Sequence, residues 1–257
     1  MEVWESAIMG VVQGLTEFLP VSSSGHLAIM QRLFGVEGGN MSFDVTVHLA
    51  TALASIVVFR REIGAIIAGA FRFQLNPQTV YLINIAVSML PVIFVGLMLG
   101  EQIETLFDGS LILVGAMLIV TAGLLALSGY VRAGVNPITP KRAFVVGLAQ
   151  AVAVLPGLSR SGTTIVAGLL QGVRREEMAR FSFMMVIIPI LGMAALDMTK
   201  SEFVFERHDL AGFATAFFTG LFACKAMVRL VSRGKLVWFA IYCAAAGLLA
   251  LLLEIFM

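Results

Sequence analysis

Long apolar runs separated by short polar segments dominate this chain of 257 residues. A helix needs about 20 apolar residues to cross the hydrocarbon core of a bilayer. Six runs reach that length, near residues 43–60, 79–100, 109–130, 178–197, 210–230 and 236–256. The pattern therefore predicts six transmembrane helices.

Two other apolar regions are interrupted by breaks rich in proline, serine and glycine. Each break divides its region into two arms, 6–19 and 24–35 in the first region and 142–155 and 162–173 in the second. At about 1.5 Å per residue, an arm reaches roughly 15–21 Å, which is too short to cross the membrane. We predict two re-entrant helical hairpins, in which Pro20 and Pro156 end the first arms and the serines and glycines cap the second arms.

The two broken regions are related by a constant offset of 137 residues. The offset superimposes Gly10 on Gly147, Gln13 on Gln150, Ser22 on Ser159, Ser24 on Ser161 and Gly25 on Gly162. An odd number of spans, three, separates the two hairpins, so they enter from opposite faces of the membrane. We expect an all-α membrane protein with an inverted-topology repeat, an arrangement that places binding sites near the bilayer midplane. The chain forms a single integral membrane domain, 1–257, with one repeat over about 1–130 and the other over about 141–257.

Composition agrees with this picture and excludes an ordinary soluble protein. Hydrophobic residues make up 59% of the chain and charged residues only 13%, whereas soluble proteins have about 25% charged residues. We expect the chain to be embedded in a lipid bilayer and not to bind nucleic acid.

The basic residues orient the helices. Thirteen of the 17 lysines and arginines fall on one side of the expected topology: Arg60, Arg61, Arg72, Arg132, Lys141, Arg142, Arg174, Arg175, Arg180, Lys225, Arg229, Arg233 and Lys235. Three fall on the other side, Arg32, Lys200 and Arg207, and Arg160 lies at the second break. By the positive-inside rule the basic side is cytoplasmic, so both termini and the first hairpin lie outside.

The breaks also carry charges at membrane depth. Glu17 lies four residues after Gln13, on the same helix face, and Arg160 lies in the second break. Ionisable groups in the bilayer are costly and commonly mark a functional site, although a structural ion pair between the hairpins is an alternative. Two helix N-termini that carry hydroxyl groups and an arginine favour an anion, in particular a phosphate.

The three histidines differ in their expected roles. His26 follows Gly25 and is within reach of the same pocket, which makes general acid–base catalysis plausible. His48 is a weaker candidate, which we expect to line the cavity or to make a structural hydrogen bond. His208 lies in a polar segment and is expected to be an inert loop residue.

The motif from Gln13 to His26 (QGLTEFLPVSSSGH), together with the motif from Pro156 to Thr164 (PGLSRSGTT), closely resembles the signatures of undecaprenyl-diphosphate phosphatases of the bacitracin-resistance type. The resemblance extends over the whole chain. It implies a prokaryotic plasma-membrane enzyme that removes the terminal phosphate of a C55 polyprenyl diphosphate. It also implies a site that opens to the outside.

The resemblance assigns roles to particular residues. It implies that Glu17, His26 and Arg160 are essential and that Ser23 is the nucleophile. Water activated by Glu17 is an equally compatible attacking group. We expect the diphosphate to contact a wider set of residues, Gln13, Ser22, Ser24, Ser159, Ser161, Gly162 and Thr164.

The family also implies a divalent cation, Mg²⁺ or alternatively Ca²⁺. Glu17 is the candidate ligand, together with the substrate phosphates. Gln13 is a weaker candidate, because relatives with glutamate at this position have a second carboxylate where this chain has an amide.

The sequence is also compatible with two other functions and with a homodimeric state. A lipid-phosphate transporter, or flippase, would need the same anion pocket and the same inverted repeat. A structural scaffold would explain the spans but not the breaks. The spacing of Gly96 and Gly100 is compatible with a homodimer, but such spacing is more often used for packing within a bundle.

Overall fold

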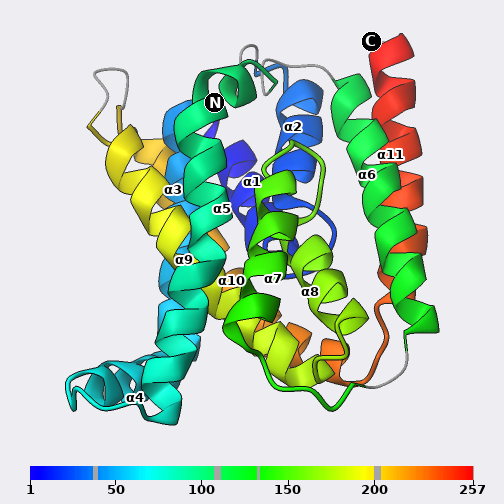
Figure 1. Ribbon diagram of the computed structural model, residues 1–257. Coiled ribbons are helices and arrows are strands. Elements are labelled where there is room, and N and C mark those ends of the chain that lie inside the picture. Colours follow the sequence, from blue (N-terminus) through cyan, green and yellow to red (C-terminus); the bar gives the residue numbers. More distant parts are fainter. Residues whose placement is uncertain (37–39, 107–110, 132–133, 200–203, 257) are drawn as a thin grey trace.

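The computed structural model describes residues 1–36, 40–106, 111–131, 134–199 and 204–256. Helices account for all the long elements in these ranges (Figure 1). They are α1 (Val3–Thr16), α2 (Ser23–Leu33), α3 (Met41–Val58), α4 (Arg60–Ala70), α5 (Pro77–Leu106), α6 (Leu111–Leu127), the 3₁₀ turn η1 (Ser128–Tyr130), α7 (Pro140–Val152), α8 (Arg160–Leu170), α9 (Arg175–Asp197), α10 (Arg207–Ser232) and α11 (Val237–Phe256).

The six expected spans are confirmed as helices. Six helical segments are long and apolar enough to cross a membrane: Met41–Val58, Pro77–Gly100, Leu111–Tyr130, Arg175–Asp197, Arg207–Ser232 and Val237–Phe256. The prediction that the third span starts at residue 109 cannot be compared, since 109 and 110 lie outside the described residues. The chain is a multi-pass helical membrane protein.

The broken regions form two pairs of short helices, α1 with α2 and α7 with α8. The prediction that Pro20 and Pro156 end the first arms is wrong, because α1 already ends at Thr16 and α7 at Val152. Proline disfavours helical backbone at the residue before it, and the chain needs several further residues to reach the caps of α2 and α8. The turn between α1 and α2 is closed by a hydrogen bond from the Val21 N–H to the Leu19 carbonyl, 2.8 Å.

Each first arm crosses a long helix from the other half of the chain. Helix α1 packs on α10, and α7 packs on α5. Glycine makes both crossings close: a methyl group at Gly10 would lie 2.3 Å from the Gly212 carbonyl oxygen, and one at Gly147 would lie 2.3 Å from the Ser88 carbonyl oxygen. Gly10 and Gly147 are partners in the 137-residue offset, so the repeat marks a shared packing contact.

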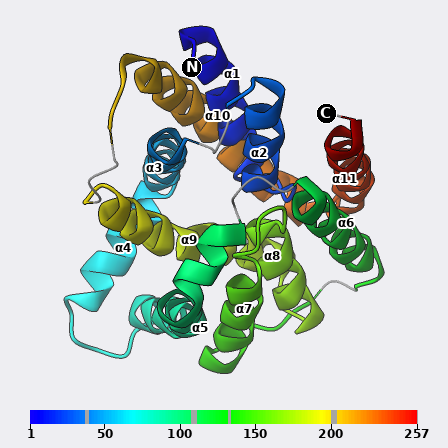
Figure 2. The same ribbon diagram turned by 90° about the horizontal axis from the view of Figure 1, so that it is seen from above.

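The remaining long helices complete the bundle. Helix α3 packs on α9, and α6 packs on α11 (Figure 2). The short helix α4 was not predicted, because Arg60–Ala70 has too few consecutive apolar residues to be recognised as a span. It lies at the end of the molecule opposite the two termini (Figure 1).

Candidate active site

The two breaks lie against each other inside the bundle. A methyl group at Gly25 would lie 3.2 Å from Gly157 Cα, and one at Gly162 would lie 3.3 Å from Pro20 Cβ. The Ser161 hydroxyl donates to the Leu19 carbonyl oxygen, 3.3 Å. Segments about 140 residues apart in the sequence therefore form one site.

Equivalent serines cap the two helices that begin at this contact. Ser22 Oγ accepts a hydrogen bond from Gly25 N–H at the start of α2 (3.3 Å), and Ser159 Oγ accepts one from Gly162 N–H at the start of α8 (3.1 Å). The next serine in each break has its hydroxyl near the capping hydroxyl, at 3.3 Å for Ser24 and 3.4 Å for Ser161. The prediction that these serines and glycines cap the second arms is confirmed.

Glu17 lies at the C-terminal end of α1 and is the centre of a hydrogen-bonded group. Its Oε2 atom accepts from Gln13 Nε2 at 3.0 Å and from the Ser23 hydroxyl at 2.5 Å. His48 Nε2 is 3.7 Å from the same oxygen, and the Glu17 side chain is only 6% exposed. A buried carboxylate that accepts a serine proton donor is suited to act as a general base.

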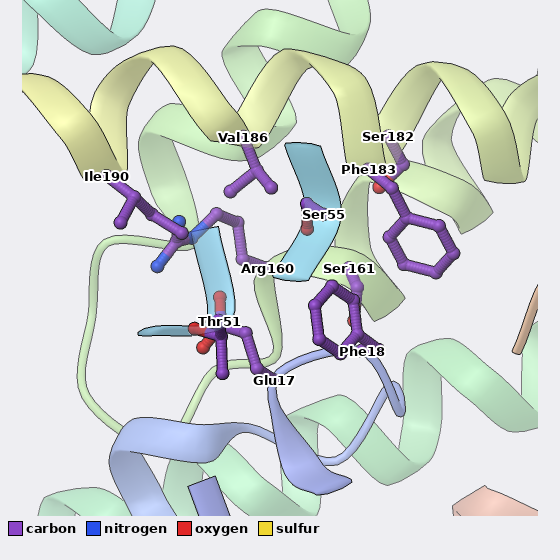
Figure 3. Close-up of a pocket in the computed structure, with 10 residues that line it drawn as sticks. All are labelled: Glu17, Phe18, Thr51, Ser55, Arg160, Ser161, Ser182, Phe183, Val186 and Ile190. Carbon is purple, nitrogen blue, oxygen red and sulfur yellow. The ribbon is translucent and has the colours of Figure 1, made fainter. Parts of the chain in front are cut away.

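Arg160, the first residue of α8, extends into the same pocket as Glu17 (Figure 3). The pocket is lined by residues of the breaks, α3 and α9: Glu17, Phe18, Thr51, Ser55, Arg160, Ser161, Ser182, Phe183, Val186 and Ile190. Among the described residues, the Arg160 guanidinium is not in direct ion-pair contact with a carboxylate, although it attracts the Glu17 carboxylate across the pocket. Its planar set of donors can therefore bind a phosphate.

The pocket is small in this conformation. Its volume is about 20 Å³, which is enough for about one water molecule.

The expectation that His48 makes a structural hydrogen bond is confirmed, whereas the acid–base role expected of His26 stays a prediction. The ring nitrogens of His26 contact the Ser22 carbonyl oxygen (2.7 Å) and the Tyr242 hydroxyl (2.8 Å), rather than Glu17 or Ser23. His48, the weaker candidate, contacts the Asp44 carbonyl oxygen at 2.7 Å and is the histidine that approaches Glu17.

The expected loop position of His208 is wrong. His208 lies in the first turn of α10, and its ring is buried within 3.3 Å of both the Glu206 and the Asp209 carboxylates. The charged and polar residues of this turn form its capping box, so a polar sequence here marks a helix start rather than a loop.

Several residues around the site were not predicted from the sequence. Thr121 on α6 accepts a hydrogen bond from Ser159 N–H at 3.0 Å, and Ser182 on α9 shares one of 2.7 Å with Thr164. Thr51 and Ser55 line the pocket from α3. Each of them is a polar residue inside an apolar span, which is the signal that could have identified it. Thr51 and Ser55 also lie four residues apart, on one face of α3.

A divalent cation fits the donor atoms only in part. Gln13 Oε1 is a buried carbonyl oxygen without a hydrogen-bond partner, close to the Glu17 carboxylate. Both are oxygen ligands of the kind that Mg²⁺ and Ca²⁺ prefer. Among the described residues, no group of three or more His, Cys, Asp or Glu side chains could hold a metal ion. The donors therefore fit an ion that obtains its other ligands from phosphate and water.

The fold defines a polytopic membrane protein in which the starts of two short helices meet at a candidate site containing Glu17, Ser23 and Arg160. The model of the family described as bacitracin resistance protein BacA matches residues 6–249, and this chain belongs to that family. This result confirms the family resemblance of the sequence motifs.

Relatives match over nearly their full length. A protein of Parabacteroides distasonis named undecaprenyl-diphosphatase is 49% identical over 263 residues, which cover 98% of each chain. A protein of Bacteroides fragilis with the same name is 48% identical, with 99% of each chain covered. One of Korarchaeum cryptofilum, again with this name, is 37% identical over 96% of this chain and 98% of its own.

Proposed function

We propose that this chain is an undecaprenyl-diphosphatase. It hydrolyses undecaprenyl diphosphate to undecaprenyl phosphate and inorganic phosphate, which recycles the lipid carrier of peptidoglycan synthesis and confers bacitracin resistance. The observation that carries this proposal is the 2.5 Å hydrogen bond between Ser23 and Glu17, with Glu17 and Arg160 lining one pocket. The names of the relatives support the same activity.

The broken helices act in this proposal as two re-entrant hairpins of an inverted repeat. An inverted repeat would exchange α1 with α7, α3 with α9, α5 with α10 and α6 with α11. Part of the packing supports this exchange, since α1 on α10 becomes α7 on α5, and α3 on α9 and α6 on α11 map onto themselves. The close packing of α3 on α10 departs from it, because α9 contacts α5 much less. Figure 1 draws α2 in the upper half and α8 in the lower half of the molecule, as opposite entry requires.

The site opens to the outer face in this proposal. Helix α4, with Arg60 and Arg61, and the segments after α6, α8 and α10 lie at one end of the molecule, and both termini lie at the other (Figure 1). The basic end is the cytoplasmic one by the positive-inside rule. Two residues used in that count, Arg132 and Lys200, lie outside the described residues.

The reaction begins with charge neutralisation and proton transfer. Arg160 and the N-termini of α2 and α8 bind the terminal phosphate. Ser23 Oγ attacks the terminal phosphorus as its proton passes to Glu17 Oε2. The bond from that phosphorus to the bridging oxygen breaks, and undecaprenyl phosphate leaves with the bonding electrons.

Water completes the reaction. It adds to the phosphoserine, the bond from phosphorus to Ser23 Oγ breaks, and the serine hydroxyl regains a proton as inorganic phosphate is released. The alternative is direct attack by a water that Glu17 deprotonates, without a covalent intermediate.

A divalent cation is part of the proposal. Glu17 and Gln13 Oε1 would hold Mg²⁺ or Ca²⁺ together with the substrate phosphates, and the ion would neutralise phosphate charge. Arg160 contributes positive charge to the same pocket from the opposite break.

The test measures phosphate release from C55 diphosphate by the purified full-length chain, with and without a chelator. We expect turnover that the chelator reduces and that Ser23→Ala largely abolishes, because the variant lacks the attacking hydroxyl. Ser232→Ala is the matched control, because this exposed serine lies at the end of α10 and bonds only its own helix. Movement of lipid between leaflets without phosphate release would overturn the proposal in favour of a transporter.

The same variants distinguish the two routes. A radiolabelled terminal phosphate trapped on Ser23 after rapid acid quenching supports the serine nucleophile. Full turnover by Ser23→Ala would instead establish attack by water.

A further inference from the structure

The backbone of the first break selects one tautomer of the neutral His26 ring. Its Nδ1 atom lies 2.7 Å from the Ser22 carbonyl oxygen. A carbonyl oxygen can only accept a hydrogen bond, so Nδ1 carries the hydrogen. The neutral ring therefore has its basic lone pair on Nε2, and the position of this atom decides what His26 can do.

Tyr242 on α11 meets that basic nitrogen. Its hydroxyl oxygen is 2.8 Å from His26 Nε2. The two ring planes are also nearly parallel, with an interplanar angle of 4° and centroids 5.5 Å apart. Both contacts come from a residue 216 positions away in the sequence, so the tertiary fold alone creates the pair.

Helix α11 contacts the same break at a second point. The Cys243 thiol donates a hydrogen bond to the Pro20 carbonyl oxygen, with a sulfur-to-oxygen distance of 3.6 Å. Ser22, whose carbonyl binds His26, has a φ angle of 68°, which is unfavourable for a residue other than glycine. A backbone in such a conformation persists only when its surroundings hold it.

We propose that Tyr242 is a positioning residue for His26. Its hydroxyl donates to Nε2 and its ring fixes the plane of the imidazole, so that His26 is held against the first break in one orientation and one tautomer. If His26 takes up a proton, Nε2–H donates to the Tyr242 oxygen instead, and the same contact serves both protonation states. The expected effect on turnover rests on the proposed phosphatase function. The arrangement of the His26–Tyr242 pair is independent of that function.

The test replaces Tyr242 by phenylalanine, which removes the hydroxyl and keeps the ring. We expect kcat for phosphate release to fall about tenfold, as for the loss of one hydrogen bond, while KM changes less than about twofold. Tyr130→Phe is the matched control, since Tyr130 lies after α6 with its side chain 86% exposed. The control should retain the turnover of the unaltered chain.

A second measurement does not depend on activity. The chain has three histidines, so ¹⁵N-histidine labelling gives three sets of ring signals, and His26→Asn identifies the set of His26. We expect Tyr242→Phe to shift the His26 Nε2 signal and Tyr130→Phe to leave it unchanged. We also expect the double variant His26→Asn, Tyr242→Phe to be no slower than His26→Asn alone.

The outcomes are distinguishable. An unshifted His26 signal in Tyr242→Phe would overturn the inference, whatever happens to turnover. Additive losses in the double variant would also overturn it, because Tyr242 would then act independently of His26. If the unaltered chain releases no phosphate, the proposed function fails, but the shifted signal still reports the His26–Tyr242 pair.

Discussion

The two breaks share a frame but carry different chemistry. In both, a serine caps a short helix through the amide three residues later, and a second serine lies beside the first. At the positions that differ, Glu17 corresponds to Val154 and Ser23 corresponds to Arg160. The shared residues bring two helix starts together. In the proposed mechanism, the differing residues provide a base and nucleophile from one side and a cation from the other.

The backbones of the breaks also differ. Ser22 has a φ angle of 68°, whereas its counterpart Ser159 has a φ angle of −68°. In the second break the positive angle belongs to Gly157, with φ 87°, where glycine costs little. The first break thus carries its strain on a serine directly before Ser23, in line with the observation that such strain gathers at active sites.

The largest expected effect comes from removing the charge that only the second break supplies. Arg160→Ala should lower phosphate release about 1,000-fold, because a preorganised group that stabilises transition-state charge contributes about 100- to 1,000-fold. The measurement is the initial rate with C55 diphosphate at saturating substrate. Arg61→Ala is the control, since Arg61 is an exposed arginine on α4. Normal turnover by Arg160→Ala would refute the division of roles between the breaks.

A smaller effect should separate the matched glutamines. Gln13 donates to Glu17, whereas both amide atoms of its counterpart Gln150 are buried without a hydrogen-bond partner. Gln13→Leu should lower turnover about 10- to 100-fold, since a hydrogen bond to a charged group contributes about 1.5–3 kcal/mol. Gln150→Leu should stay within about twofold of the unaltered chain, because it removes only unpaired polar atoms.

The same assay checks both glutamine variants, with thermal unfolding in detergent as the control for folding. Equal losses at the two positions would mean that Gln13 acts through packing alone. In that case Gln13 and Gln150 would not differ in function, and the difference between the two breaks would lie in other residues.

Much of the fold could be predicted because the bilayer imposes a length on every spanning helix. The six spans differ from their predicted limits by a few residues, as with α3, which begins at Met41 rather than residue 43. Helix α4 could not be predicted from apolar length, since it is short and carries Arg60, Arg61 and Glu62 in its first turn. The early ends of α1 and α7 depend on how much chain the turns need, which a proline alone does not specify.

The candidate site was predictable only where its residues are close in the sequence or fall in matched motifs. The caps at Ser22 and Ser159 follow from local spacing, and Glu17 and Ser23 share one motif. The contacts of His26 with Tyr242 and of His48 with Glu17 are set by the packing of α11 and α3 against the first break. No periodicity within α11 or α3 indicates which residue of the first break each helix will meet.

The smallest expected effect tests the backbone difference directly. Alanine and glycine both lack the capping hydroxyl, so comparing them at one position isolates the cost of the Cβ atom. At Ser22, with φ 68°, alanine carries a steric cost of about 1–2 kcal/mol that glycine avoids. At Ser159, with φ −68°, that cost is absent. At each position, the stability of the alanine variant is subtracted from that of the glycine variant. This difference should be about 1 kcal/mol larger at Ser22 than at Ser159.

Unfolding free energies of the four purified variants in one detergent provide the measurement, and the greater flexibility of glycine in the unfolded chain cancels between the two positions. An equal advantage of glycine at both positions would show that Ser22 is not strained relative to Ser159. If glycine has a larger stability advantage at Ser22 and the Ser22→Gly variant also has lower turnover, the strained backbone next to Ser23 contributes to function as well as to structure. The two breaks would then differ in mechanics as well as in charge, because only the first would store strain beside its reacting group.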